Sequence, residues 1–181
     1  MKLEMRTLKN IAAVAMTLAV VFGAASLKPV TANAAEASVS ASIEEENSYI
    51  SFQDEAYQNE FLRRVNNERA KYGLQPLVMG DAKLTAAAQQ RAEEIATVNS
   101  HVRPNGTKWY TVLSEYGVTD AAAGENAAWG SVSPEEVVNA WMNSEGHRAN
   151  ILDPEARAMG VGYYYNSSST WGHQWIQLFT K

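Results

Sequence analysis

The sequence contains no cysteine among its 181 residues. A chain without thiols forms no disulfide and carries no lipid on a cysteine side chain, so non-covalent interactions alone must stabilise its fold. Histidine is nearly as scarce, with three residues in the whole chain. Any chemistry that needs an imidazole is therefore restricted to three positions.

The chain also lacks an excess of positive charge. Its 15 lysines and arginines are outnumbered by 20 aspartates and glutamates, which gives a formal net charge of −5. Binding to nucleic acid relies on clustered Lys and Arg against the phosphates. The composition therefore excludes nucleic acid as the expected partner, and it suits a protein that stays soluble outside the cell.

Only one long apolar run occurs, and it lies at the N-terminus. It spans residues 11–27 and follows three basic residues, while residues 32–34 read Ala-Asn-Ala. A membrane-spanning helix needs about 20 apolar residues, which is more than this run supplies. We expect residues 1–34 to be a cleaved secretory signal peptide, with a membrane anchor as the alternative. The expected mature protein is secreted, has no transmembrane anchor and carries a net charge near −8.

The segment that follows, residues 35–51, is small, polar and acidic, without apolar periodicity. Such a segment buries too little surface to offset the entropy lost on ordering, and we expect a flexible linker. Residues 52–181 have the length of one domain.

Apolar periodicity predicts several helices and then a hairpin. A first helix runs through Tyr57 to Arg69 and ends before Gly73, and a second runs from Asp81 to about Val98. The second has an alanine-rich face (84, 87, 88, 92, 95 and 96), which indicates close packing against a neighbour. A shorter helix is expected over residues 108–115.

The clearest helix start is Ser133-Pro134-Glu135-Glu136, which has the form of a capping box. Val137, Val138 and Trp141 form the expected buried stripe, and Gly146 is the expected end. Residues 158–165 and 171–179 are rich in β-formers around a polar turn and predict an antiparallel hairpin. Helices followed by strands indicate an α+β fold.

Three polar residues stand in unusual surroundings: His101 before an Arg-Pro-Asn-Gly turn, Glu125 after Gly124, and His147 after Gly146. Each has a plainer interpretation. His101 and Glu125 would be solvated loop residues, and His147 would complement the C-terminus of the helix before it. The third histidine, His173, alternates with two tryptophans along the last strand, where a structural role is favoured.

Taken together, these pieces resemble the bacterial branch of the CAP superfamily, which comprises the cysteine-rich secretory, venom-allergen and plant pathogenesis-related proteins. The resemblance covers about residues 57–180. It rests on residues 65–69 (Val-Asn-Asn-Glu-Arg), 84–92, 101–106 (His-Val-Arg-Pro-Asn-Gly), 124–126 (Gly-Glu-Asn), 141–152, 160–162 (Gly-Val-Gly) and 175–179 (Trp-Ile-Gln-Leu-Phe).

The resemblance implies an α–β–α sandwich, with a small central antiparallel sheet flanked by helices and a cleft lined by histidines and glutamates. It places His101 and Glu125 in that cleft, and His147 as the second histidine of the bacterial branch. A second glutamate of the family falls at Ser144, next to Glu145. The family's last histidine falls at Gln174 rather than at His173.

Three functions are compatible with these residues, and the third is a cell-surface or cell-wall-associated factor that acts through sheet or groove contacts while His101, Glu125 and His147 only stabilise the cleft. The first is a secreted binding module whose cleft (His101, Glu125, Glu145 and His147) holds an extracellular ligand, a lipid or a cell-wall or protein partner. A divalent cation, zinc by preference, would be held by His101 and His147 without being obligatory. The alternative is a metal-assisted, protease-like hydrolase with Glu125 as general base. Against it, the sequence has no His-Glu-x-x-His helix, no Gly-x-Ser-x-Gly elbow and no cysteine nucleophile.

Overall fold

The computed structural model describes residues 55–181, so the expected signal peptide and linker lie outside the described residues. The elements in chain order are α2 (Glu55–Lys71), β1 (Val78–Met79), α3 (Ala82–Ile95), α4 (Thr111–Glu115), β2 (Ala122–Trp129), α5 (Pro134–Met142), α6 (Glu145–Ile151), β3 (Ala158–Asn166) and β4 (Gly172–Thr180). None of the helices in this part of the chain has the length and apolar character needed to cross a membrane.

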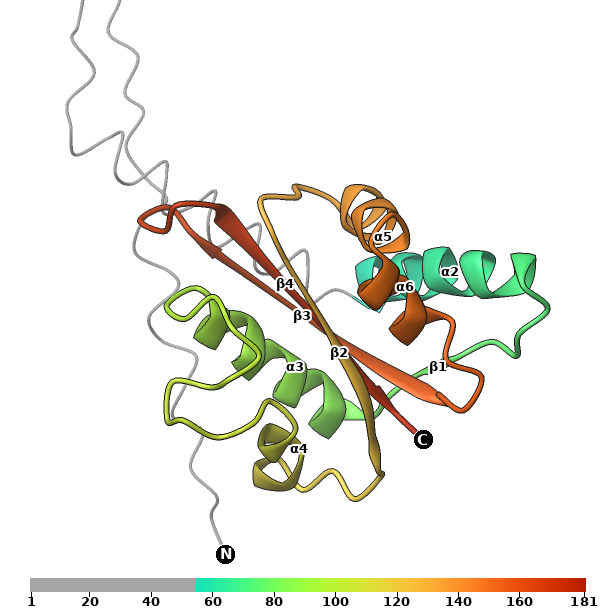
Figure 1. Ribbon diagram of the computed structural model, residues 1–181, viewed down its shortest axis with the longest axis horizontal. Helices are drawn as coiled ribbons and strands as arrows, with labels where there is room; N and C mark the ends of the chain where they lie inside the picture. The colour runs from blue at the N-terminus through green and yellow to red at the C-terminus, as the bar shows by residue number, and fades with distance from the viewer. Residues whose placement is uncertain (1–54) are drawn as a thin grey trace, which may run out of the picture.

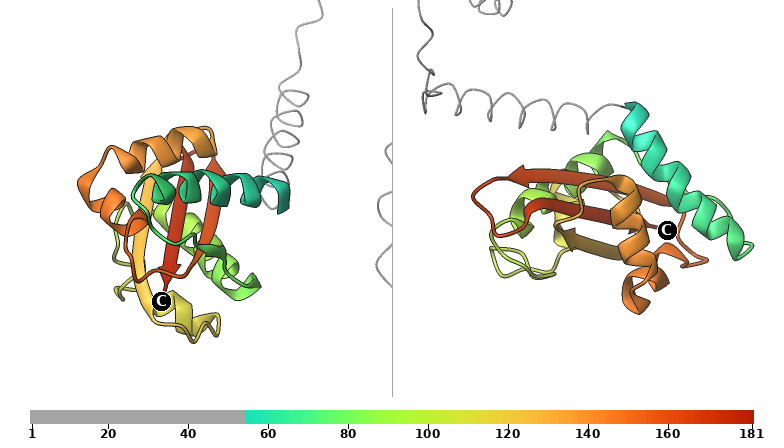
Figure 2. Two further views of the ribbon diagram at one scale, coloured as in Figure 1. Left: turned by 90° about the vertical axis from the view of Figure 1, so that its right-hand side faces the viewer. Right: turned by 90° about the horizontal axis from the view of Figure 1, so that it is seen from above.

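The four strands form one sheet in the order β1-β3-β4-β2. β3 and β4 form the expected antiparallel hairpin, and β2 pairs antiparallel with β4 on the other side. The short β1 pairs parallel with β3, so the sheet is mixed rather than wholly antiparallel. Helices α3 and α4 cover one face, and α2, α5 and α6 cover the other (Figures 1 and 2). The α+β class and the α–β–α sandwich are thus confirmed.

Helix α3 packs against its face of the sheet at very short range. A Cβ added to Gly162 would lie 2.2 Å from the carbonyl oxygen of Ala88, and one added to Gly160 would lie 2.7 Å from that of Leu84. Only glycine on β3 allows this approach, and small side chains on the helix, such as Ala87, complete it. The alanine-rich face predicted for this helix therefore packs as expected, although the helix ends at Ile95.

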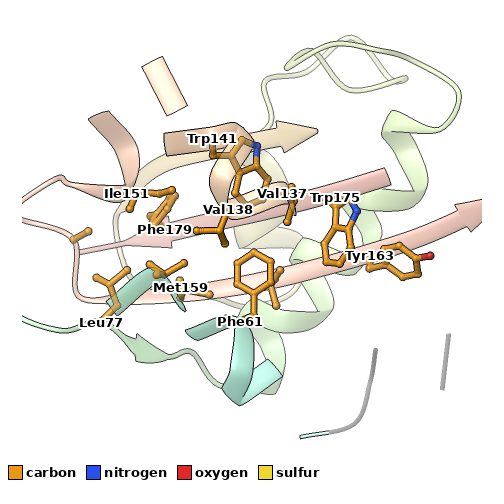
Figure 3. Packing of buried hydrophobic residues seen from close by; sticks show 13 residues of the cluster. Phe61, Leu77, Val137, Val138, Trp141, Ile151, Met159, Tyr163, Trp175 and Phe179 are labelled. Atoms are coloured by element: carbon orange, nitrogen blue, oxygen red, sulfur yellow. The ribbon is translucent and has the colours of Figure 1, made fainter. Parts of the chain in front are cut away.

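The opposite face contains the larger aromatic core (Figure 3). Phe61 of α2 lies edge-on to Trp141 of α5 at 5.9 Å between ring centroids and stacks on Trp175 of β4 at 6.0 Å. Trp141 is 1% exposed and donates from Nε1 to the carbonyl oxygen of Ala127 at 3.2 Å. Its predicted position in the core is confirmed.

Two expectations about the helix that begins at Pro134 were wrong, and the helix expected over residues 108–115 begins only at Thr111. The helix that begins at Pro134 ends at Met142, not at Gly146, because Ser144 adopts an extended backbone (φ −110°, ψ 123°) that starts a separate helix, α6. The capping box forms only in part. Ser133 Oγ accepts from the Glu136 amide at 3.2 Å, but the Glu136 carboxylate accepts from the amide of Val132 rather than from that of Ser133.

Candidate functional site

His101 lies in the loop between α3 and α4. Its carbonyl oxygen accepts from the Trp109 amide at 3.0 Å, and the chain between them turns at Gly106, whose φ is +82°. This conformation favours glycine, and it folds residues 101–109 back on themselves, as the Arg-Pro-Asn-Gly sequence indicated. The His101 side chain remains 57% exposed.

Glu125 lies inside β2, opposite Leu178 of β4, and not in a solvated loop as its plainer interpretation required. Gly124, which precedes it, is not required for an unusual backbone conformation. Its φ is not positive, but a Cβ there would lie 2.8 Å from Asn150 Oδ1. Gly124 is thus needed because α6 packs directly against the strand.

The Glu125 carboxylate joins His101 to a buried arginine. His101 Nδ1 lies 2.7 Å from Glu125 Oε1, and Arg91 of α3 donates from Nε to Oε2 at 2.8 Å and from Nη2 to Oε1 at 3.2 Å. The side chains of Glu125 and Arg91 are both 0% exposed. Because an ionised carboxylate only accepts, the shared proton belongs to His101 Nδ1. Both oxygens of Glu125 are therefore engaged inside the protein.

Arg91 was missed by the sequence analysis, although a signal was present. It lies seven residues after Leu84, four after Ala87 and three after Ala88, and so falls on the apolar stripe of α3. A charge on a buried stripe needs a buried partner. Such an arginine predicts a carboxylate on the sheet that the helix covers, and here the neighbouring strand β2 supplies it.

The ionic contacts continue beyond Arg91. Its Nη1 donates to Glu94 Oε2 at 2.6 Å, and Glu94 also accepts from Arg103, at 2.7 Å to Nη2. Arg103 is 4% exposed and donates in addition to both oxygens of Glu115, at 2.5 and 2.9 Å. We call the set His101, Glu125, Arg91, Glu94, Arg103 and Glu115 the ionic chain. Its members alternate in sign when His101 is protonated.

The third expected residue, His147, approaches the same strand from the other side. It lies in the first turn of α6, not at the C-terminus of the preceding helix as the plainer interpretation required. Its carbonyl oxygen accepts from Asn126 Nδ2 at 3.1 Å, and Asn150 Nδ2 donates to Asn126 Oδ1 at 2.9 Å and to the carbonyl oxygen of Glu125 at 3.1 Å. We call Asn126 and Asn150 the amide pair.

The two histidines have opposite electrostatic surroundings. The hydrogen bond with Glu125 raises the pKa of His101, against the effect of partial burial. Burial lowers the pKa of His147, and the charge of a protonated His101 lowers it further. The two rings thus lie near enough to repel each other when both are charged.

The remaining residues expected from the sequence, Glu145 and His173, take no part in the contact between His101 and Glu125. Glu145 is exposed in the first turn of α6. His173 lies two residues before Trp175 on β4, so both side chains are on the face covered by α2 and α5. Its Nδ1 lies 2.7 Å from the Tyr163 hydroxyl. Glu125 points to the α3 face, where its neighbour Leu178 is buried. The sheet therefore separates His173 from His101.

The residues present do not form a metal site of the usual kind. No group of three or more His, Asp or Glu side chains within residues 55–181 is arranged to hold a metal ion. Glu125, the expected third member, is occupied by Arg91 and His101. That leaves two imidazoles, fewer protein ligands than structural or catalytic zinc sites supply.

The sandwich, the turn that carries His101 and the buried glutamate of β2 define the class of protein, and comparison with known families agrees. The model of the CAP group, described as the cysteine-rich secretory protein family, matches residues 62–179. The chain belongs to this family, although it contains no cysteine.

Individual relatives show the same domain in longer chains. YkwD of Bacillus subtilis (strain 168) is 41% identical over 123 residues, which is 67% of this chain and 47% of YkwD. A solved extracellular protein with an SCP domain from Bacillus anthracis superposes with a TM-score of 0.59 at 26% identity, over 68% of this chain and 39% of that one. The chain thus spans less than half of each.

An outer surface protein of Borrelia burgdorferi superposes with a TM-score of 0.61 over 70% of this chain and 93% of its own. Its identity is 21%, so this likeness concerns the fold alone.

Proposed function

We propose that this protein is an extracellular binding module of the CAP family, and that His101 is the residue its ligand contacts. One observation carries the proposal: an exposed imidazole is fixed through Nδ1 by a buried carboxylate. No other described side chain hydrogen-bonds to this ring, so Nε2 remains for a ligand. A ring whose orientation is set in advance loses little entropy on binding.

The geometry favours binding over the hydrolase alternative. A general base must reach the proton that it removes, directly or through one water. Glu125 is fully buried, and both of its oxygens accept hydrogen bonds from Arg91 and His101. The carboxylate is suited to orienting His101. A hydrolase built on this site would have to use His101, not Glu125, as its base.

An extracellular location is supported from two directions. The N-terminal sequence has the form of a signal peptide. The Bacillus anthracis relative, at 26% identity, is described as an extracellular protein. Together they support a ligand at the cell surface, and we propose the cell wall as its source.

A divalent cation is a secondary part of this proposal. A cation held by His101 and His147 would receive two imidazole nitrogens from the protein and would take its other ligands from water or from the bound partner. Such a cation would bind weakly and would not be required for folding.

The test is co-sedimentation with purified cell walls of Bacillus subtilis, the organism of the relative YkwD. We expect the wild type to sediment with the walls, His101→Ala to remain in solution while folded, and His173→Ala to sediment like the wild type. If His101→Ala sedimented as well as the wild type, His101 would not be the contact.

A parallel assay separates binding from catalysis. Peptide and ester substrates are incubated with the wild type and with Glu125→Gln, each with and without a chelator. We expect no turnover in any sample. Turnover by the wild type that is abolished by the chelator, or by Glu125→Gln in a sample shown to be folded, would replace the binding module with the hydrolase.

A further inference from the structure

We infer that Arg103 is the positioning residue of the site. Arg103 attaches the turn that carries His101 to Glu94, and the same carboxylate also binds Arg91, the arginine that holds Glu125. This inference rests on the proposed role of His101 and adds a residue that touches neither His101 nor a ligand.

The bond between His101 and Glu125 joins two segments that must be held separately. Glu125 is fixed within β2 and by Arg91 of α3. His101 belongs to a loop, and the isolated β-bridge beside it, between Val102 and Lys108, joins this loop to itself and not to the sheet. A contact of 2.7 Å between such segments persists only if the loop is attached to the layer that contains Arg91.

Arg103 supplies this attachment two residues after His101. Its backbone amide donates to the carbonyl oxygen of Thr107 at 2.9 Å, and its own carbonyl accepts from Gly106 at 2.8 Å, so the residue is part of the turn itself. Its guanidinium contacts Glu94 on α3 and Glu115 on α4, and Nη1 also donates to Thr111 Oγ1 at 2.9 Å.

Glu94 makes the attachment specific to the site. The same carboxylate receives Arg91 Nη1 at 2.6 Å, and Arg91 Nη2 donates to the carbonyl oxygen of Ser100 at 3.1 Å, immediately before His101. The loop is therefore fixed before His101 by Arg91 and after it by Arg103. Both arginines bind the same carboxylate, Glu94. His101 and Glu125, the two ends of the hydrogen bond, are therefore fixed relative to each other.

The packing of α4 does not require this arginine. Val112 and Leu113 of α4 are buried in the core cluster with α3 and β4. Loss of the guanidinium should therefore release the turn more than the helices. Lysine keeps the charge but cannot form the planar, paired contacts with two carboxylates that arginine forms.

The test follows the side-chain nitrogen and proton resonances of His101 by NMR in the full mature chain. In the wild type, Nδ1 should show the signature of a proton hydrogen-bonded to a carboxylate. Arg103→Lys should abolish or strongly shift that signature while leaving the resonances of His173 unchanged. Arg63→Lys is the matched control, because Arg63 pairs with Glu60 on the exposed side of α2 and should leave His101 unchanged.

A folded Arg103→Lys protein with the wild-type His101 signature would overturn the inference. If this variant failed to fold, Glu115→Gln would decide, because Glu115 is half-exposed and its loss weakens only the outer carboxylate contact. Glu115→Gln should shift the His101 signature in the same direction by a smaller amount, and an unchanged spectrum would overturn the inference.

The measurement needs no ligand, so it can be separated from the proposed function. Wild-type protein that fails to sediment with cell walls, together with a shifted His101 in Arg103→Lys, would refute the function and keep the positioning role. Sedimentation that is retained in the wild type and lost in Arg103→Lys would support both.

Discussion

Different sets of hydrogen bonds support the two histidines of the site, although both sets include adjacent residues of β2. Beneath His101 lies the ionic chain, which starts at Glu125 and runs into the α3 layer. Behind His147 lies the amide pair, which starts at Asn126 on the opposite face of the strand. Neighbouring residues of a strand point to opposite faces, and here this alternation assigns one support to each layer of helices.

The difference has consequences for stability and for pH. A buried ion pair is costly to break on one side, because it leaves an uncompensated charge. An amide pair with one buried and one half-buried member costs less to break and does not titrate between pH 5 and 8. The site thus combines a charged half, the ionic chain, with an uncharged half, the amide pair.

The largest expected effect on stability comes from a substitution of Glu125, the buried carboxylate of the ionic chain that binds His101. Glu125→Gln leaves the fully buried Arg91 with Glu94 as its one remaining carboxylate. We expect a loss of about 3–5 kcal/mol in the free energy of unfolding, measured by urea titration. The exposed Glu145→Gln, as the matched control, should change it by less than about 0.5 kcal/mol. A loss below about 1 kcal/mol for Glu125→Gln would show that the charged half does not carry the stability assigned to it.

The amide half should respond less strongly. Asn150→Ala removes the donor to Asn126 Oδ1 and to the carbonyl oxygen of Glu125. We expect a loss of about 1–3 kcal/mol, constant between pH 5 and 8. Asn139, which is exposed on α5, provides the control, because Asn139→Ala should change the free energy of unfolding by less than about 0.5 kcal/mol. A loss that varied with pH would mean that the two halves are not independent.

The pH dependence of stability should have opposite signs at the two histidines. The pKa of His101 is raised in the folded protein, so its stabilising contribution is complete below the ordinary value of about 6.5 and is lost as pH rises through the folded pKa. The pKa of His147 is lowered, so its contribution is complete above that value and is lost as pH falls through the folded pKa.

Denaturant titrations of His101→Gln and His147→Gln from pH 5 to 8 check these signs. The free energy of unfolding of the wild type should exceed that of His101→Gln by the largest amount at acidic pH. The wild type should be less stable than His147→Gln only at acidic pH. Parallel profiles for the two variants would remove the electrostatic distinction between the halves.

The smallest expected effect is metal binding. Zinc titration by calorimetry should show one weak site near neutral pH, which is lost on acidification because ligating imidazoles must be neutral. Either His101→Ala or His147→Ala should abolish this site, and His173→Ala should retain it. Full zinc affinity in the double variant His101→Ala/His147→Ala would show that the cation binds elsewhere.

The helical layers followed from sequence because their signals are local. The stripe around Trp141 and the alanine-rich face of α3 repeat at helical spacing, and the hairpin has β-rich runs around a polar turn. The break between α5 and α6 was missed because Ser144 leaves the helical conformation without a proline or a glycine at that position. β1 is only two residues long, too short for any pattern.

β2 could not be predicted for a different reason. Its central residues, Glu125 and Asn126, are polar yet buried, so alternation of apolar and polar residues is absent where the strand is most enclosed. Their partners, Arg91 and Asn150, lie 34 and 24 positions away in the chain. The candidate site follows the same rule. The resemblance named His101 and Glu125, whose side chains lie 2.7 Å apart, but the residues that hold them depend on tertiary contacts.

We propose that His101, fixed by Glu125, is the point of contact with a cell-wall ligand. The most direct measurement titrates soluble cell-wall fragments of Bacillus subtilis into the labelled protein and follows the side-chain resonances of all three histidines. We expect His101 to shift most, His147 to shift less, and His173, on the far face of the sheet, to stay unchanged. A saturable shift at His173 with none at His101 would contradict the account.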